Sequence, residues 1–261
     1  MDSTDVDRVA RRAGDHPALE NAARLGYAVS GLLHLLIGWL GFQLALGQHG
    51  GSADQSGALQ SLASTSVGRA TLWVAVVGFL GLGLWQLTEL AVRGEASDRV
   101  KAGAKAVLYL GLSATSLAWA RGSGTTTSSS QSVDVTATLM KQPFGRILVA
   151  VVGVVVIGVG GYHVVKGWRR RFLDDLTGHP GQVAEAAGRV GYIAKGVALA
   201  VVGVLFIVAA LRNTAKGATG LDGALRTLLD LPYGKVLVIL VSLGFAAYGI
   251  YSLARARYAK V

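Results

Sequence analysis

The chain has 261 residues, of which 52% are hydrophobic and only 15% are charged, and its mean hydropathy is +0.48. This composition excludes an ordinary soluble globular protein, and the absence of cysteine excludes a disulfide framework and a thiolate site. The net charge of +10 is spread beside apolar segments rather than gathered in one patch, so it indicates membrane topology and not a nucleic-acid partner.

Residues 1–23 are polar and mixed in charge, which predicts a cytoplasmic N-terminal segment rather than a signal peptide. Six segments without Asp, Glu, Lys or Arg follow, at 25–53, 70–88, 106–120, 147–165, 196–211 and 236–254. A helix needs about 20 residues to cross a membrane. The third and fifth segments are short, but the stems of Lys105 and Lys195 can extend them toward the interface.

The positive charges favour one orientation of these six spans. Sixteen Lys and Arg residues lie at the chain ends and in the connections after the second and fourth segments, against eight in the other connections. Because cytoplasmic loops are enriched in Lys and Arg, we expect a multi-pass plasma-membrane protein with both termini cytoplasmic.

Two short motifs recur three times along the chain. RLGYAVSG at 24–31 returns as RVGYIAKG at 189–196 and, in a degenerate form, as RVKAGAKA at 99–106. A second motif reads SVGR at 66–69, PFGR at 143–146 and PYGK at 232–235. The sequence therefore predicts three two-helix repeats, at 24–94, 99–172 and 189–258, with a cytoplasmic linker at 173–188.

Since each repeat has an even number of spans, all three enter the membrane in the same orientation. We expect an all-α protein with six transmembrane helices around a pseudo-threefold axis, although a linear arrangement fits the same pattern. One face of the first helix of each repeat carries only small residues at a spacing of seven, which favours close helix packing. These predicted seam residues are Gly31, Gly38, Ala45, Ala106, Ser113, Ala120, Gly196, Gly203 and Ala210.

The outer connections differ between repeats. GALQSLAS in the first and GALRTLLD in the third predict short interfacial helices. The middle connection contains GSGTTTSSSQS, which has no apolar periodicity and predicts a mobile tether.

The two recurring motifs and the glycine-rich spans that end in an aromatic residue resemble the bacterial membrane family catalogued as domain of unknown function 1206. The resemblance covers about 24–258 and implies the three-repeat membrane architecture, but it brings no activity and no catalytic residue. Two departures from the family pattern are Ser66 in place of proline, and Lys101 and Ala102 in place of Gly and Tyr.

Glu89 lies within the second span, and its register counterparts are Lys166 and Arg255. An ionisable residue at such depth is expensive unless it is paired. We therefore expect a rim ion cluster of these three residues, with a structural role favoured over a transport or proton site. One turn earlier, an aromatic residue occupies the same register position in each repeat, which predicts a ring of three aromatic side chains, Trp85, Tyr162 and Tyr251. We interpret these residues as interfacial anchors, and a ligand cage is the alternative.

Arg69, Arg146 and Lys235 share the outer start of the second helix in each repeat, where the helix dipole disfavours cations. Their recurrence suggests an anionic partner, and lipid phosphate is the simplest one.

His34 and His163 are the intramembrane histidines, but their counterparts in other repeats are not histidines, so we expect no cofactor and no metal. No catalytic motif is present in the sequence. We expect a non-enzymatic scaffold or lipid-interacting module whose partners are anionic membrane lipids and a possible membrane protein. The alternatives are a small transporter or channel with a pseudo-threefold path, and a haem- or metal-binding redox protein.

Overall fold

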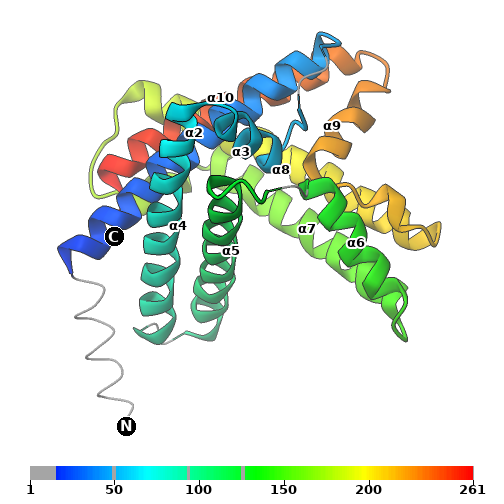
Figure 1. The fold of residues 1–261 in the computed structure, drawn as a ribbon, viewed down its shortest axis with the longest axis horizontal. Helices are drawn as coiled ribbons and strands as arrows, with labels where there is room; N and C mark the ends of the chain where they lie inside the picture. The colour runs from blue at the N-terminus through cyan, green and yellow to red at the C-terminus, as the bar shows by residue number, and fades with distance from the viewer. Residues whose placement is uncertain (1–15, 49–50, 93–94, 125–126, 261) are drawn as a thin grey trace.

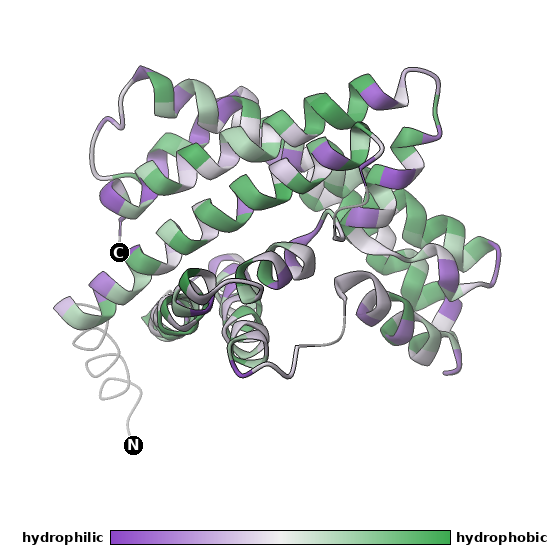
Figure 2. Cartoon of the chain, turned by 45° about the horizontal axis from the view of Figure 1, so that its top comes forward, coloured by the Kyte–Doolittle hydropathy of each residue, from purple (hydrophilic) through white to green (hydrophobic). Residues whose placement is uncertain are grey.

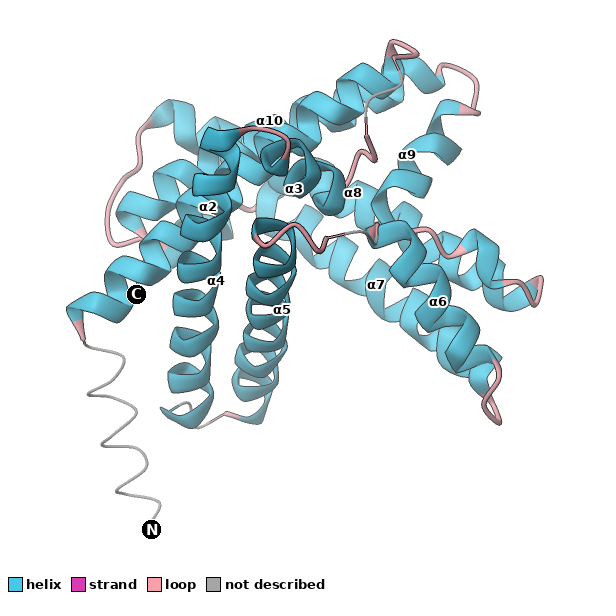
Figure 3. Cartoon of the chain, in the orientation of Figure 1, coloured by secondary structure: helices cyan, strands magenta, loops and turns pink. Residues whose placement is uncertain are grey.

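The computed structural model describes residues 16–48, 51–92, 95–124 and 127–260, so most of the predicted N-terminal segment lies outside the described residues. These residues form helices and no strand, apart from an isolated bridge between Leu176 and Ala259 (Figure 3). The six long helices are α2 (Pro17–Ala45), α4 (Ser66–Val92), α5 (Ala96–Ala120), α7 (Gly145–Trp168), α8 (Gln182–Leu211) and α10 (Gly234–Tyr258). The shorter elements are α3 (Gln55–Ala63), α6 (Ser128–Met140), η1 (Arg171–Asp175), η2 (Ala215–Gly217) and α9 (Gly220–Leu229).

Five of the long helices are long and apolar enough to cross a membrane, namely α2, α4, α7, α8 and α10. Figure 2 shows hydrophobic residues along most of their lengths, which is compatible with a multi-pass membrane protein. Helix α5, predicted as the sixth span, is not among the five because Lys105 and several hydroxyl side chains interrupt its apolar sequence.

The most extensive helix contacts join different repeats. They pair α4 with α5, α7 with α8, and α10 with α2. Within repeats, α2 packs on α4 and α8 on α10, whereas α5 and α7 diverge and, in the part of the chain that is described, do not pack along each other (Figure 1). Contacts therefore run in the order α5, α4, α2, α10, α8, α7, and we call the gap between α5 and α7 the open side.

Small residues let the three interfaces between repeats close tightly. The positions that meet are Gly38 with Ser242, Ser113 with Val76, and Gly203 with Gly153. A Cβ atom on Gly38 would lie 2.7 Å from the Ser242 carbonyl oxygen, and one on Gly203 would lie 2.6 Å from that of Gly153. At the α4–α5 interface, Ser113 Oγ instead donates a hydrogen bond of 2.9 Å to the Val76 carbonyl. Backbone approaches backbone at the two glycine contacts, as expected where van der Waals packing associates membrane helices.

Two substitutions in the middle repeat explain its open side. Gly26 in the first repeat contacts the backbone of Gly78, and a Cβ atom on Gly191 in the third would lie 2.5 Å from the backbone of Tyr248. In the middle repeat, Lys101 takes the register position of Gly26 and Gly191. Val155 takes the register position of Gly78. A lysine and a valine cannot enter contacts that leave no room for a Cβ atom, so α5 cannot approach α7 as α2 approaches α4.

Residues 125–126 of the predicted mobile tether lie outside the described residues, but from Ser128 on the connection is ordered as helix α6, so for that part the prediction is wrong. Its start is held by a capping bond from Ser130 N to Thr127 Oγ1 and by a bond of 2.9 Å from Ser128 N to Ser56 Oγ at the start of α3. Asp222 in the first turn of α9 accepts a bond of 2.8 Å from Ala53 N, just before α3. The starts of the three short helices are thus tied together, and we call this side of the molecule the short-helix end.

The glycine of the second motif has a packing role. Gly68, Gly145 and Gly234 each lie directly against a carbonyl oxygen in the last turn of the preceding short helix. A side chain at these positions would separate the short helix from the long helix that follows, so the SVGR, PFGR and PYGK motifs mark this tight turn.

We expect Gly38→Leu and Gly203→Leu each to lower the thermal unfolding midpoint of the purified protein in detergent. Overfilling a packed contact typically costs about 1–3 kcal/mol, and the neighbouring atoms at both positions include backbone atoms that cannot rotate away. Gly111→Leu is the matched control, because no atom lies within 4 Å of a Cβ atom at that position. Equal midpoints for all three variants would contradict the seam assignment.

Candidate functional site

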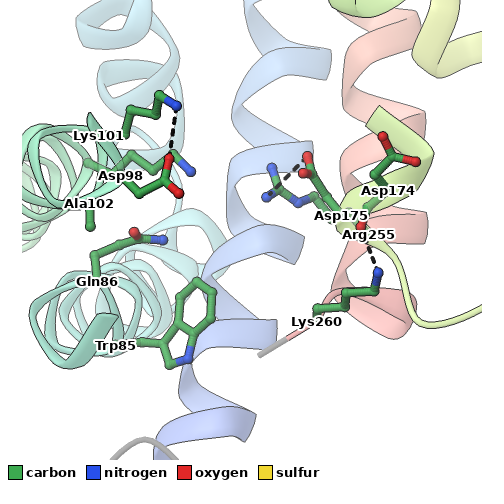
Figure 4. Close-up of a pocket in the computed structure, with 10 residues that line it drawn as sticks. Trp85, Gln86, Asp98, Lys101, Ala102, Asp174, Asp175, Arg255 and Lys260 are labelled. Atoms are coloured by element: carbon green, nitrogen blue, oxygen red, sulfur yellow. Dashed lines mark hydrogen bonds and ion pairs between the residues drawn. The ribbon is translucent and has the colours of Figure 1, made fainter. Parts of the chain in front are cut away.

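A polar cavity of about 190 Å³ lies at the end of the long helices opposite the short helices, which we call the basic end (Figure 4). Helices α4 and α5 form one wall, and η1 with the end of α10 forms the other. The lining residues are Trp85, Gln86, Asp98, Lys101, Ala102, Lys105, Asp174, Asp175, Arg255 and Lys260. Four cations therefore face three carboxylates around one small space.

The α4–α5 wall of the cavity lacks the aromatic ring that the other two interfaces between repeats have. At the α2–α10 interface, the Arg255 guanidinium lies 4.2 Å from the centre of the Tyr27 ring. At the α7–α8 interface, Lys166 Nζ lies 5.5 Å from the centre of the equivalent Tyr192 ring. Both are cation–π contacts that fill the interface near the basic end.

The α4–α5 interface has Ala102 at the tyrosine position and Glu89 at the cation position. Both members of the cation–π pair are thus replaced. Ala102 lines the cavity, and its methyl group is much smaller than the tyrosine ring at this register position in the other two interfaces.

Asp175 is the carboxylate that joins two of the predicted cluster residues. Its Oδ2 atom lies 2.6 Å from Lys166 Nζ and 3.9 Å from Arg255 Nη2. Asp175 belongs to η1 in the linker, which was predicted from the sequence only as a connection. The acidic pair that follows the arginine run two residues later is the signal that could have indicated it. The pairing of Glu89 with Lys166 or Arg255 stays a prediction.

Hydrogen bonds from α10 hold η1 in place. Tyr251 Oη donates to the Phe172 carbonyl at 3.1 Å, and Lys260 Nζ donates to the Asp174 carbonyl at 2.8 Å. These bonds place Asp175 beside the two cations.

Arg255 has an unused hydrogen-bond donor at the cavity. Its Nε atom is buried and makes no hydrogen bond within the described ranges. Across the cavity, Lys101 donates to Asp98 at 2.9 Å from an exposed position on α5. A buried donor without an acceptor is costly, and the inaccessible Nε atom is such a donor.

The three aromatic residues at the shared position do not form a ring. Tyr251 is fully buried and contacts the Phe172 ring with 5.0 Å between centroids, whereas Tyr162 is 57% exposed on the open side. Trp85 lines the cavity. No ring contact joins these three residues in the part of the chain that the structure describes, because the middle repeat is open where the third repeat is closed.

The outer cations have a structural explanation that the sequence did not indicate. Arg69 Nε donates to the Ala63 carbonyl at 3.2 Å, and Arg146 Nε donates to the Ala210 carbonyl at 3.2 Å. These carbonyls end α3 and α8, where the helix dipole favours a cation. Each arginine thus stands at the start of its own helix but interacts with the end of a neighbouring one, and no lipid phosphate is needed to explain it. Lys235 makes no such contact in the described chain.

His34 contacts a lysine inside the helix bundle. Its Nδ1 lies 2.7 Å from the Ser30 carbonyl oxygen and its Nε2 lies 3.3 Å from Lys195 Nζ. Because a carbonyl only accepts, Nδ1 carries the hydrogen and Nε2 is the acceptor for Lys195. Lys195 also lies 4.4 Å from the centre of the Tyr248 ring. The sequence reading assigned Lys195 to the membrane interface and missed this contact.

His163 is held separately, with its Nδ1 2.8 Å from the Val159 carbonyl oxygen and its ring 5.7 Å from that of Tyr192. No group of three or more metal-ligating side chains occurs in the residues the structure describes.

We expect Asp175→Asn to destabilise the protein far more than Asp98→Asn. Removing one partner of a buried ion pair costs about 3–5 kcal/mol, and losing an exposed one about 0.5 kcal/mol. The two carboxylates are similarly exposed, at 31% and 35%, but the partners of Asp175 are 14% and 15% exposed whereas the Lys101 partner of Asp98 is 64% exposed, so the cost for Asp175 falls between these limits. Thermal unfolding in detergent measures both, and equal shifts would argue against Asp175 as the shared anion.

Comparisons with known proteins agree with the three-repeat organisation. The chain is 29% identical over 257 residues to an uncharacterized protein, YxxB, of Bacillus subtilis (strain 168), covering 93% of this chain and 92% of that one. No solved structure matches the chain. The model of the Domain of Unknown Function DUF1206 matches three times, at residues 25–92, 100–170 and 190–259. Since these matches cover most of the chain, the protein belongs to the DUF1206 family.

Proposed function

We propose that this is a non-enzymatic plasma-membrane protein with six transmembrane helices, both termini cytoplasmic, and three repeats around a pseudo-threefold axis that is open at the middle repeat. The support is the recurrence of equivalent contacts. Arg24 donates to the Arg257 carbonyl, and its counterpart Arg189 lies over the ring of Trp168, which occupies the register position of Arg257. The basic end, with most of the Lys and Arg residues, is the cytoplasmic end under the positive-inside rule.

We propose further that the protein is a lipid-interacting module that binds the phosphate of an anionic phospholipid in the basic-end cavity. The observation that carries this proposal is the excess of cations at the cavity, where Lys101, Lys105, Arg255 and Lys260 face only three carboxylates. A phosphate oxygen is the acceptor that a guanidinium prefers. Because the cavity lies at the ends of membrane-spanning helices, it is at the depth of lipid headgroups.

Native mass spectrometry of protein from lipid nanodiscs tests this assignment. We expect phosphatidylglycerol to be retained and phosphatidylcholine to be lost. Lys101→Glu combined with Lys105→Glu should reduce phosphatidylglycerol retention about tenfold or more, because charge-assisted hydrogen bonds contribute about 1.5–3 kcal/mol.

Lys235→Glu is the matched control, since it changes the charge of a lysine at the other end of the long helices. Equal retention by the cavity variant and the control, or no preference between the two lipids, would refute the cavity as a phosphate site.

Transport is the second candidate function, and Lys195 favours it. Its described contacts are with His34 Nε2 and the Tyr248 ring and include no carboxylate. Charged side chains inside membrane helices commonly mark substrate or proton paths. The redox alternative has weaker support, because both ring nitrogens of His34 are already engaged.

Proteoliposomes that contain a pH-sensitive dye distinguish transport from simple lipid binding. If the protein carries protons, the wild type should dissipate an imposed pH gradient and Lys195→Met should not. A wild-type rate equal to that of protein-free liposomes would eliminate proton transport and leave the lipid-binding role.

A further inference from the structure

The open side of the middle repeat carries apolar residues that are buried elsewhere in the molecule. Leu108 on α5 is 57% exposed, whereas Leu33 at the same register position of α2 is 2% exposed. Val159 on α7 is 43% exposed, and its counterpart Leu82 on α4 is fully buried. The two surfaces have kept their apolar character although α5 and α7 do not pack along each other in the described residues.

We propose that this open side binds an acyl chain of the same anionic phospholipid whose phosphate occupies the cavity; the inference rests on the lipid-binding function proposed above. The cavity and the apolar open side are continuous along one face of α5. Lys101 and Lys105 line the cavity, and Leu108 follows them on the same face of α5, because residues three, four and seven apart share one face of a helix. A polar, cationic site thus continues directly into an apolar surface, which is the polarity pattern of a phospholipid.

The size of the residues on the open side supports the same proposal. The closed repeats bring backbones together with glycine pairs such as Gly26 and Gly78, but the corresponding residues here are Lys101 and Val155. These side chains prevent the close approach that helix association in a membrane requires. A flexible acyl chain fills an irregular space between separated helices without needing such approach, so lipid fits this surface better than a transmembrane helix does.

The length of the open side also matches the length of an acyl chain. One leaflet contributes roughly 15 Å of the ~30 Å hydrocarbon layer, which equals about ten helical residues at 1.5 Å each. From Lys105, ten residues of α5 extend to Thr115, within the helix that ends at Ala120. The open side is thus long enough for an acyl chain whose headgroup is bound in the cavity.

Photocrosslinking tests the proposal. Phosphatidylglycerol with a diazirine midway along one acyl chain is placed in nanodiscs with the full-length protein, irradiated, and its adducts are mapped by mass spectrometry. We expect adducts on α5 and α7 beside Leu108 and Val159, at a yield about tenfold above that on the exposed face of α10 around Leu240. An excess of unlabelled phosphatidylglycerol should suppress the open-side adducts and leave the others unchanged.

A matched pair of variants isolates the apolar surface. Leu108→Asn should lower the open-side adduct yield about tenfold, whereas Val107→Asn should not, because Val107 is 74% exposed on an adjacent face of the same helix. Retained phosphatidylglycerol with adducts distributed evenly over all lipid-facing helices would overturn the acyl-chain site while sparing the headgroup site. Loss of phosphatidylglycerol retention in the wild type would overturn both.

The absence of native cysteine allows a test of the rival occupant. In a Leu108→Cys variant, a second copy of the chain packed into the open side would give a disulfide-linked dimer on mild oxidation. Such a dimer, formed at the expense of lipid adducts, would overturn the proposal, and a variant that stays monomeric supports it.

Discussion

Backbone contact between helices at small residues is the interaction on which the rest of this structure depends. Gly38, Ser113 and Gly203 occupy one register position and bring three different pairs of helices together. In a lipid environment there is no hydrophobic driving force between helices, so close van der Waals packing must replace it. The same contacts determine which side chains meet near the basic end, because they set the register of each helix against its neighbour.

The middle repeat shows what happens when this constraint is released. Lys101 stands where the other repeats have glycine and Ala102 where they have tyrosine, and the two changes act at different interfaces of α5. The lysine keeps α5 away from α7, and the alanine lines the cavity that α4 and α5 form with η1 and the end of α10. These two neighbouring residues thus distinguish the middle repeat from the other two, because it has a polar cavity beside an apolar open side. The other two repeats keep the bundle together.

Much of the architecture could be predicted from patterns that are local along the chain. Apolar segments separated by charged connections predicted the long helices, and two recurring motifs predicted the three repeats. The middle outer loop was mispredicted because a run of Gly, Ser and Thr has little helical propensity of its own; α6 forms because Ser128 and its neighbours bond to the other short helices. The cations Arg69 and Arg146 were misinterpreted for a similar reason, since the carbonyls they bind end other helices.

The sequence by itself therefore determined the helices, their repetition and the family, because hydrophobicity and motif spacing act over one or two helical turns. Only the tertiary structure decided which carboxylate joins Lys166 and Arg255, where the cavity lies and which repeat is open. Each of these depends on how closely two helices can approach. That distance is set by pairs of residues that lie far apart in the chain, such as Gly26 with Gly78 and Gly191 with Tyr248. No pattern within one segment of the sequence shows which residues form these pairs.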